Sequence, residues 1–275
     1  MEGNIKHSLQ LLTGCGSVEG DGTLKFVYNE PALVINDGDE NVLVVGDLHV
    51  GAEAKLSDKG VHIYGTGAGM AKRIASTAEE FSARRVILLG DVKDTILYPT
   101  LQERRSLSAF FEGLSGLKVT VVAGNHDAHL DGIVDIMPVR EVLLDEVALL
   151  HGNTWPSEDA VMRKYIVTAH NHIAVSMRDK NGAFYREKAW LIAPPSPTRA
   201  RRRYSTFKAK RLIVMPAYND LIVGMPVNEL SSGKENINPL LRNGIFRHGD
   251  TYVYTLRGDY LGKVSELVKR GNVTP

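Results

Sequence analysis

Five short polar clusters, each at the end of an apolar run, constrain the fold of this 275-residue chain more than any other feature. They are Asp47-Leu48-His49, Asp91-Val92-Lys93-Asp94, Asn125-His126-Asp127, His151 and His170-Asn171-His172. Carboxylates and imidazoles are costly to gather in a protein interior unless something binds them, and divalent cations bind this mixture well. The chain is therefore predicted to fold so that the clusters meet around metal ions.

The apolar runs before the first three clusters predict buried strands at residues 42–46, 86–90 and 119–124. Each run is continuous rather than alternating, which is typical of strands covered on both faces. Apolar residues at helical spacing predict helices within residues 69–85 and 101–114. An alternation of strands and helices favours parallel strands with right-handed crossovers, whose carboxyl ends carry the ligand-binding loops. These three clusters are thus expected on one edge of a sheet.

Shorter strand-like runs joined by turns predict a second sheet after about residue 138. These runs cover residues 139–144, 147–150, 165–169, 173–178, 184–192 and 212–215. We predict one α/β domain over residues 1–275, with a two-layer β-sheet core flanked by helices and a peripheral basic segment at about 196–211. That arrangement would place the remaining histidines on the same rim as the first three clusters.

Composition excludes several other classes of protein. Cys15 is the only cysteine, so an intrachain disulfide and a thiolate metal site are both excluded, and a reducing compartment is favoured. No stretch approaches ~18 apolar residues, and the N-terminus lacks the features of a signal peptide. We therefore expect a cytoplasmic protein that does not span a membrane. The net charge of +1 says little about partners, because a local basic stripe can hide in a balanced total.

Two of the clusters contain metal-ligand pairs at alternate positions. In an extended strand end, residues two apart point the same way, so Asp47 and His49 are expected to bind one ion together. The same spacing predicts a joint role for His170 and His172. Both pairs are interpreted as metal ligands.

The other predicted ligands point to a dinuclear site. Asp91 is the obvious bridge between two cations, while Asn125 supplies a neutral oxygen and His151 a further imidazole. This set of nitrogen and oxygen donors suits Mn, Fe, Zn, Co or Ni better than Ca or Mg. Two such ions would generate hydroxide near neutral pH and polarise a phosphoryl oxygen, so the implied reaction is hydrolysis of a phosphate ester.

The residues between the ligands suggest acid–base chemistry. His126 is predicted to meet the substrate, where it would protonate the leaving oxygen or stabilise the charge of the transition state. Asp94 is expected to orient the His126 imidazole. Lys93 is placed either against a substrate phosphate or on the surface, and Asp127 is expected to cap or turn the chain.

Taken in order, the five clusters resemble the pattern of the calcineurin-like metallophosphoesterase superfamily: D-x-H, G-D-x-x-D, G-N-H-D/E, a lone H and G-H-x-H. The resemblance implies a first metal held by Asp47, His49, Asp91 and His172, and a second held by Asp91, Asn125, His151 and His170. It implies manganese as the first choice of metal, and His126 as a catalytic residue with Asp94 as its partner. Ala169 stands where the family usually has glycine, which would matter if the backbone there required a positive φ.

The resemblance extends beyond the five clusters. Residues 186–190, 212–217 and 224–228 look similar to an archaeal phosphoesterase group related to SbcD, the nuclease subunit of a DNA repair complex. Asp94 stands where SbcD-type nucleases commonly have histidine. The resemblance therefore implies phosphate ester chemistry, whereas this departure argues against carrying nuclease activity over from SbcD.

A basic stretch from residue 199 to 211 contains seven Lys and Arg residues, with Tyr204 and Phe207 interleaved. Cations can neutralise phosphates and aromatic rings can stack on unpaired bases, as in a track for single-stranded nucleic acid. On that interpretation Arg201, Arg202 and Arg203 bind substrate. The alternative is a solvated loop.

Three functions fit these features. The first is a dinuclear metal-dependent phosphodiesterase or nuclease that acts on DNA, RNA or a nucleotide through metal-activated hydroxide. The second is a phosphomonoesterase, or a hydrolase of small nucleotides or cyclic phosphates. The third is a metal-bound scaffold subunit of a nucleic-acid-processing complex, although such a scaffold needs no general acid like His126. Apolar residues at 237–241 and 245–246 would either dock a partner or a second copy of the chain, or cover the second sheet.

Overall fold

A computed structural model describes residues 22–57, 60, 63, 65–230 and 237–270; the predictions made for the N-terminus and Cys15 lie outside these residues. The first sheet has five strands in the order β1-β2-β3-β4-β5. They are β1 (Leu24–Phe26), β2 (Ala32–Asp37), β3 (Glu40–Val45), β4 (Arg85–Leu89) and β5 (Lys118–Val122). The pairs β3–β4 and β4–β5 are parallel, which confirms the predicted strand–helix–strand pattern.

The second sheet has nine strands, of which seven follow the order β12-β9-β10-β11-β8-β7-β6. These seven are β6 (Val142–Leu143), β7 (Val147–Leu149), β8 (Tyr165–Thr168), β9 (Ile173–Arg178), β10 (Phe184–Ala193), β11 (Arg211–Val214) and β12 (Met225–Pro226). Strand β13 (Tyr252–Thr255) pairs with β10, and β14 (Tyr260–Lys263) pairs with β13. The pairs β6–β7 and β9–β10 are antiparallel.

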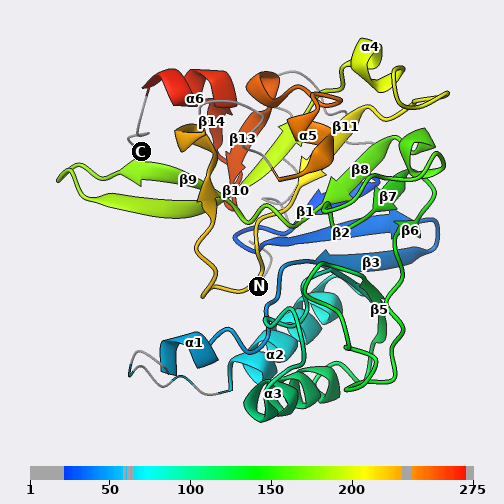
Figure 1. Cartoon of the computed structure of the whole chain (residues 1–275), viewed down its shortest axis with the longest axis vertical. Coiled ribbons are helices and arrows are strands. Elements are labelled where there is room, and N and C mark those ends of the chain that lie inside the picture. The colour runs from blue at the N-terminus through cyan, green and yellow to red at the C-terminus, as the bar shows by residue number, and fades with distance from the viewer. Residues whose placement is uncertain (1–21, 58–59, 61–62, 64, 231–236, 271–275) are drawn as a thin grey trace.

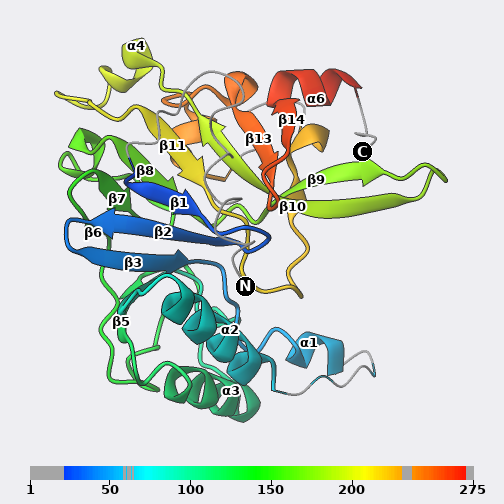
Figure 2. The ribbon, with the colours of Figure 1, turned by 180° about the vertical axis from the view of Figure 1, so that it is seen from behind.

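Helices cover the outer faces of the two sheets (Figure 1). The α-helices are α1 (Ala54–Ser57), α2 (Thr66–Glu80), α3 (Leu101–Glu112), α4 (Pro197–Ala200), α5 (Pro239–Arg242) and α6 (Val264–Arg270). Short 3₁₀ helices are η1 (Ala160–Met162), η2 (Val227–Glu229) and η4 (His248–Asp250). Helices α2 and α3 lie against the first sheet, while α5 and α6 lie on the far side of the second sheet, as the reverse view also shows (Figure 2).

Three apolar cores hold these layers together. Between the sheets, Val42 and Val44 of β3 pack with residues of the second sheet such as Trp190. On the other face of β3, Leu43 and Val45 pack against α2 and α3. Full burial of one such side chain contributes about 1.5–3 kcal/mol to the free energy of unfolding. Burial on both faces explains the continuous apolar runs and confirms the predicted two-layer core flanked by helices.

The apolar tail belongs to the third core, on the outer side of the second sheet. Leu240, Leu241, Ile245 and Phe246 are all buried there. Of the two alternatives left open by the sequence, the structure therefore supports coverage of the second sheet for these residues. Ile237, at the start of the tail, is half exposed.

No helix within the described ranges has the length and apolar character needed to cross a lipid bilayer.

Candidate metal centre

The candidate metal centre is built from loops at the carboxyl ends of strands from both sheets. Asp47 and His49 follow β3, Asp91 follows β4, and His151 and His170 follow β7 and β8. The two rims are in contact, because the His151 Nδ1 atom lies 2.9 Å from the Leu89 carbonyl oxygen at the end of β4. The polar clusters therefore meet where the carboxyl ends of the two sheets come together.

The backbone of these loops is unusual. Left-handed φ angles occur at five predicted ligands: Asp47 (53°), His49 (42°), Asp91 (50°), His170 (69°) and His172 (44°). Such conformations are uncommon for residues other than glycine, cost of order 1–3 kcal/mol each and cluster at functional sites. The expectation that the alternate-position pairs extend their strands is therefore wrong. The left-handed backbone at these positions sets the direction of the side chains instead.

Ala169, where the family usually has glycine, is not among the described residues with positive φ; the left-handed residue is the next one, His170. The alanine side chain is fully buried, and a side-chain carbon at Gly46 would lie 2.8 Å from its Cβ atom. The alanine is thus accommodated because the facing position, Gly46, has no side chain.

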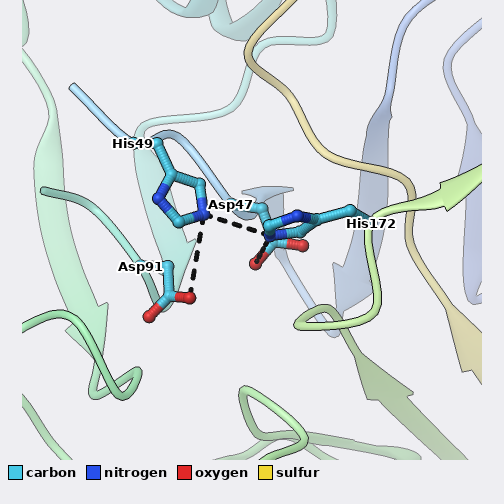
Figure 3. A group of neighbouring side chains, drawn as sticks. All are labelled: Asp47, His49, Asp91 and His172. Carbon is cyan, nitrogen blue, oxygen red and sulfur yellow. Dashed lines mark hydrogen bonds and ion pairs between the residues drawn. The ribbon is translucent and has the colours of Figure 1, made fainter. Parts of the chain in front are cut away.

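The first ligand group contains Asp47, His49, Asp91 and His172, whose ligand atoms all lie within 4.8 Å of one another. The Nε2 atoms of His49 and His172 face each other at 3.0 Å. His172 Nε2 is 3.7 Å from Asp47 Oδ1, and His49 Nε2 is 3.7 Å from Asp91 Oδ2 (Figure 3). These four residues are the same set that the resemblance implies for the first metal.

The second group contains Asp91, His151 and His170. His170 Nδ1 lies 3.1 Å from His151 Nε2, which is 3.3 Å from Asp91 Oδ2. One oxygen of Asp91 therefore faces both groups, as the predicted bridge requires. Asn125 lines the same cavity as Asp91 and His170.

The donor atoms fit divalent cations. Asp47 Oδ2 is buried and has no hydrogen-bond partner within the described part of the chain. A buried, unpaired carboxylate oxygen is costly, and so are two imidazole nitrogens that face each other at hydrogen-bond distance without a shared ion or proton. A cation in each group would satisfy these atoms. Together with the shared Asp91, this suggests a dinuclear metal site.

The pKa values of the candidate ligands determine which of them carry a proton at pH 7. Burial and the charge of His151 lower the pKa of His170 to about 4, and burial together with His49 lowers that of His172 to about 3. Both rings are therefore neutral at pH 7, the form that binds metals. Burial raises the pKa of Asp47 to about 7. Burial opposes the charge on His151, but the hydrogen bond to Asp91 and the charge of Asp47 outweigh it and raise its pKa to about 9.

We expect metal binding to the metal-free protein to release protons. Ligands bind in their deprotonated forms, and at pH 7 Asp47 is partly protonated and His151 largely so, whereas His170 and His172 have no proton to lose. The apparent affinity should thus rise as pH increases from 6 to 9. Titration calorimetry with Mn²⁺ in buffers of different ionisation enthalpy measures the release. Equal heats in all buffers would contradict it.

His126 is oriented by backbone rather than by a side chain. Its Nδ1 atom lies 2.5 Å from the carbonyl oxygen of Asp94. The carboxylate of Asp94 instead forms an ion pair with Lys55, whose Nζ atom lies 2.7 Å from Asp94 Oδ2. The other oxygen, Oδ1, lies 3.5 Å from His49 Nδ1. The predicted pairing of the Asp94 side chain with His126 is therefore corrected. The carboxylate thus lies beside His49, a candidate metal ligand, and acidic side chains in this position commonly orient metal-binding imidazoles.

Lys93 is neither on the surface nor in the cavity. Its side chain is fully buried, and its ammonium donates to the carbonyl oxygens of Thr95, Ile96 and Leu97. The structure therefore contradicts both predicted positions. Lys93 holds the loop that follows the second polar cluster.

Three polar residues support the ligand loops. Asp127 accepts hydrogen bonds of 2.8 Å from the backbone N–H groups of Gly124, Asp91 and Val92, and so ties the loop after β4 to the loop after β5. This agrees with its predicted role in turning the chain, and the third polar cluster signals it. The other two supports are Glu103 and Asn219.

Glu103 accepts from the backbone N–H groups of Asp94 and Thr95 at 2.9 Å. Asn219 donates to the carbonyl oxygen of Leu48 at 2.8 Å. The sequence analysis missed both. The Thr100-x-x-Glu103 spacing marks a helix start but does not reveal the tertiary contact, and Asn219 carries no local signal at all.

The basic stretch lies at the opposite end of the second sheet from the ligands. Strands β8 and β11 are parallel, so His170 follows the carboxyl end of β8, whereas Arg201, Arg202 and Arg203 precede the amino end of β11. The side chain of Tyr204 is buried, and that of Phe207 is half-buried against the outer core. The structure does not bring these arginines to the metal centre, and Tyr204 is not free to stack on a base.

A cavity of about 480 Å³ opens beside the ligand groups. Its wall includes Asn125, His126 and His172, together with Arg186 and Met225. Arg186 was not predicted as a site residue, because a single arginine within a strand carries no local signal. The cavity places a cation and apolar surface beside the candidate metal site.

The fold and the site define the class of protein. Two groups of carboxylates and imidazoles that share Asp91, at the rim of a two-sheet sandwich, suggest a dinuclear metal site. The family model described as "Calcineurin-like phosphoesterase superfamily domain" matches residues 41–210, and the chain belongs to this superfamily. The protein is thus a hydrolase that acts on phosphate esters.

A solved nuclease structure shares the fold. The crystal structure of Pseudomonas putida nuclease MPE has a TM-score of 0.54 and 17% sequence identity, and the match covers 85% of this chain and 92% of that one. YfcE, a phosphoesterase from E. coli, has a TM-score of 0.33 and 18% identity over 52% of this chain and 75% of its own. The comparison with curated proteins gave no match.

Proposed function

We propose that the protein is a metal-dependent phosphodiesterase that cleaves nucleic acid. The observation that carries the proposal is the cavity beside the metal ligands, which runs past His126 to Arg186. A phosphodiester needs room for a group on each side of its phosphorus atom, and this cavity is open beyond the ligand groups. The likeness in fold to a bacterial nuclease is consistent with this function.

In this proposal the seven predicted ligands hold two divalent ions, with manganese as the first choice. When bound, such ions act as Lewis acids on a phosphoryl oxygen and lower the pKa of a bound water. Loops with left-handed backbone carry five of these ligands.

His126 is proposed to transfer a proton to the leaving oxygen. A carbonyl oxygen can only accept, so the contact with Asp94 keeps a hydrogen on His126 Nδ1. The Nε2 atom is then the one available in the cavity, 4.0 Å from Asp91 Oδ2. In the imidazolium form it donates its proton to the oxygen whose bond to phosphorus breaks, and the ring becomes neutral.

The proposal predicts metal-dependent cleavage of phosphodiesters. Metal-stripped protein should be inactive, and Mn²⁺, Ni²⁺, Co²⁺, Zn²⁺ and Mg²⁺ should be compared on bis(p-nitrophenyl) phosphate, p-nitrophenyl phosphate, single- and double-stranded DNA, and RNA. We expect Mn²⁺ to support cleavage of the diester and of at least one polynucleotide. Hydrolysis of the monoester alone would show a phosphomonoesterase, and no turnover of any substrate would favour the scaffold.

A further inference from the structure

The β9–β10 hairpin extends beyond the rest of the second sheet as a projecting arm (Figures 1 and 2). We define the arm as residues 176–186. Its two strands pair from Phe184 opposite Arg178 to Arg186 opposite Ser176. The arm therefore starts beside the candidate metal centre, where β9 follows His172, and leads away from it.

One face of the arm carries an aromatic ring between two cations. Residues directly opposite each other on paired strands share a face, and so do alternate residues along one strand. Arg178, Phe184 and Arg186 thus lie on the same face, and all three are exposed, with Phe184 at 57%. The opposite face of β9 is buried, because Val175 and Met177 pack in the outer core.

This exposed face is continuous with the substrate cavity. Arg186 lines the cavity of about 480 Å³ at the metal ligands. It also lines a second cavity of about 270 Å³, together with Ser176, Phe184, Tyr185 and Glu229. A ligand that occupied both cavities would pass over Arg186.

The side chains match an unpaired, phosphate-linked strand. A guanidinium binds phosphate through two parallel hydrogen bonds, and an exposed aromatic ring offers a surface on which a base can stack. The Arg178 guanidinium lies 4.6 Å from the centre of the Phe184 ring, so the two groups hold each other in place. In a duplex the bases already stack on one another, so the exposed ring favours a single strand.

The carboxylates near the arm, Glu229 and Asp179, would repel a bound phosphate only weakly. The Glu229 carboxylate is 3.8 Å from an Arg186 nitrogen, but both side chains are about half exposed, so the pair contributes little and a phosphate can replace it. At the tip, Asp179 accepts hydrogen bonds from the backbone N–H groups of Asn181 and Ala183. Its carboxylate is thus used within the turn.

We propose that the arm binds the single-stranded nucleic acid whose scissile phosphate lies at the metal centre, with Arg186 and Arg178 on its phosphates and Phe184 under a base. This inference rests on the proposed nuclease function. It gives the strand-binding role to the arm, at the same end of the sheet as the ligands, instead of to the basic stretch at the other end.

Binding of a fluorescent 12-nucleotide single-stranded DNA should test the arm, with His126→Ala, Mn²⁺-loaded protein so that the strand is not cut. Adding Arg178→Ala, Phe184→Ala or Arg186→Ala is expected to raise Kd roughly tenfold each. Phe184→Trp should keep the affinity, and Glu229→Gln should increase it. Arg84→Ala, which removes an exposed cation at the amino end of β4, is the matched control. Thermal unfolding checks that each variant is folded.

The outcomes separate this inference from the proposed function. If protein with intact His126 cleaves the oligonucleotide but folded arm variants bind it as tightly as Arg84→Ala does, the arm proposal is wrong and the nuclease proposal stands. If the protein hydrolyses only small esters and does not bind the strand, both proposals are wrong. A fall in affinity for a 12-mer that exceeds the fall for a dinucleotide supports the arm, because only the longer strand reaches Phe184.

Discussion

Asp91→Ala is expected to lose both metal ions and to lower turnover by about 10³-fold or more. One carboxylate oxygen of Asp91 faces both ligand groups, 3.7 Å from His49 Nε2 and 3.3 Å from His151 Nε2, so its removal weakens both sites at once. Bound metals supply several kcal/mol of transition-state stabilisation, and every 1.4 kcal/mol is tenfold in rate. Metal content per chain by mass spectrometry, with turnover of bis(p-nitrophenyl) phosphate, measures the effect.

Two further variants make this prediction specific. Asp91 also accepts a 2.9 Å hydrogen bond from the His126 backbone N–H, so the near-isosteric Asp91→Asn separates loss of charge from loss of loop structure. We expect it to lose metal as well, because a neutral amide does not offset two adjacent cations. Asp131→Ala, at an exposed carboxylate, should keep full metal content. Two ions per chain in Asp91→Ala would show that it is not the bridge.

His126→Ala is expected to keep both ions but to lower cleavage of natural phosphodiesters by about 10²–10⁴-fold, the usual contribution of a general acid. The ring lines the cavity and is not needed to complete either ligand group. The loss should be much smaller with p-nitrophenyl esters, since nitrophenolate leaves without protonation. Rates for both kinds of ester, measured beside metal content, test the role. Equal losses for both would point to charge stabilisation instead of proton transfer.

Asp94→Asn is the matched comparison for His126→Ala. The backbone carbonyl of Asp94 contacts His126, and this atom is kept in the variant. The side chain faces His49 and Lys55, so its change should weaken metal binding by about 10- to 100-fold, as for other groups that orient metal ligands. Added Mn²⁺ should therefore restore activity. If excess metal gave no recovery, the carboxylate would have the role in proton transfer that the sequence had suggested.

Strand positions were predictable because burial of a strand requires a pattern of apolar residues that is visible in the local sequence. Strand β3 is covered on both faces, and the continuous run at residues 42–45 records this directly. The helical spacing of Met70, Ile74 and Ala78 likewise records the buried face of α2. Local patterns of this kind are set by neighbouring residues in the chain, so no knowledge of distant contacts is required to interpret them.

Backbone conformation at the ligands was not predictable in the same way. Asp47 and His49 follow a strand, and extended geometry was the simplest expectation, yet both have left-handed φ angles. Contacts from outside the loop hold them there: the backbone N–H of His49 donates to the Asp91 carbonyl, and Asn219 donates to the carbonyls of Leu48 and His49. Strain of this kind persists only where distant groups compensate for it.

The sequence by itself indicated the phosphate ester chemistry of this protein, because the ability to bind a metal is a property of residue type and the five clusters carry the candidate donors. Only the tertiary structure decided how the remaining charges are used. It buried Lys93 beneath a loop, turned the Asp94 carboxylate toward His49, and separated Arg201, Arg202 and Arg203 from the metal ligands. It placed Arg186 at the cavity instead. The reason is physical: a charged side chain can lie in solvent, in an ion pair or against a substrate, and only the elements packed around it select among these.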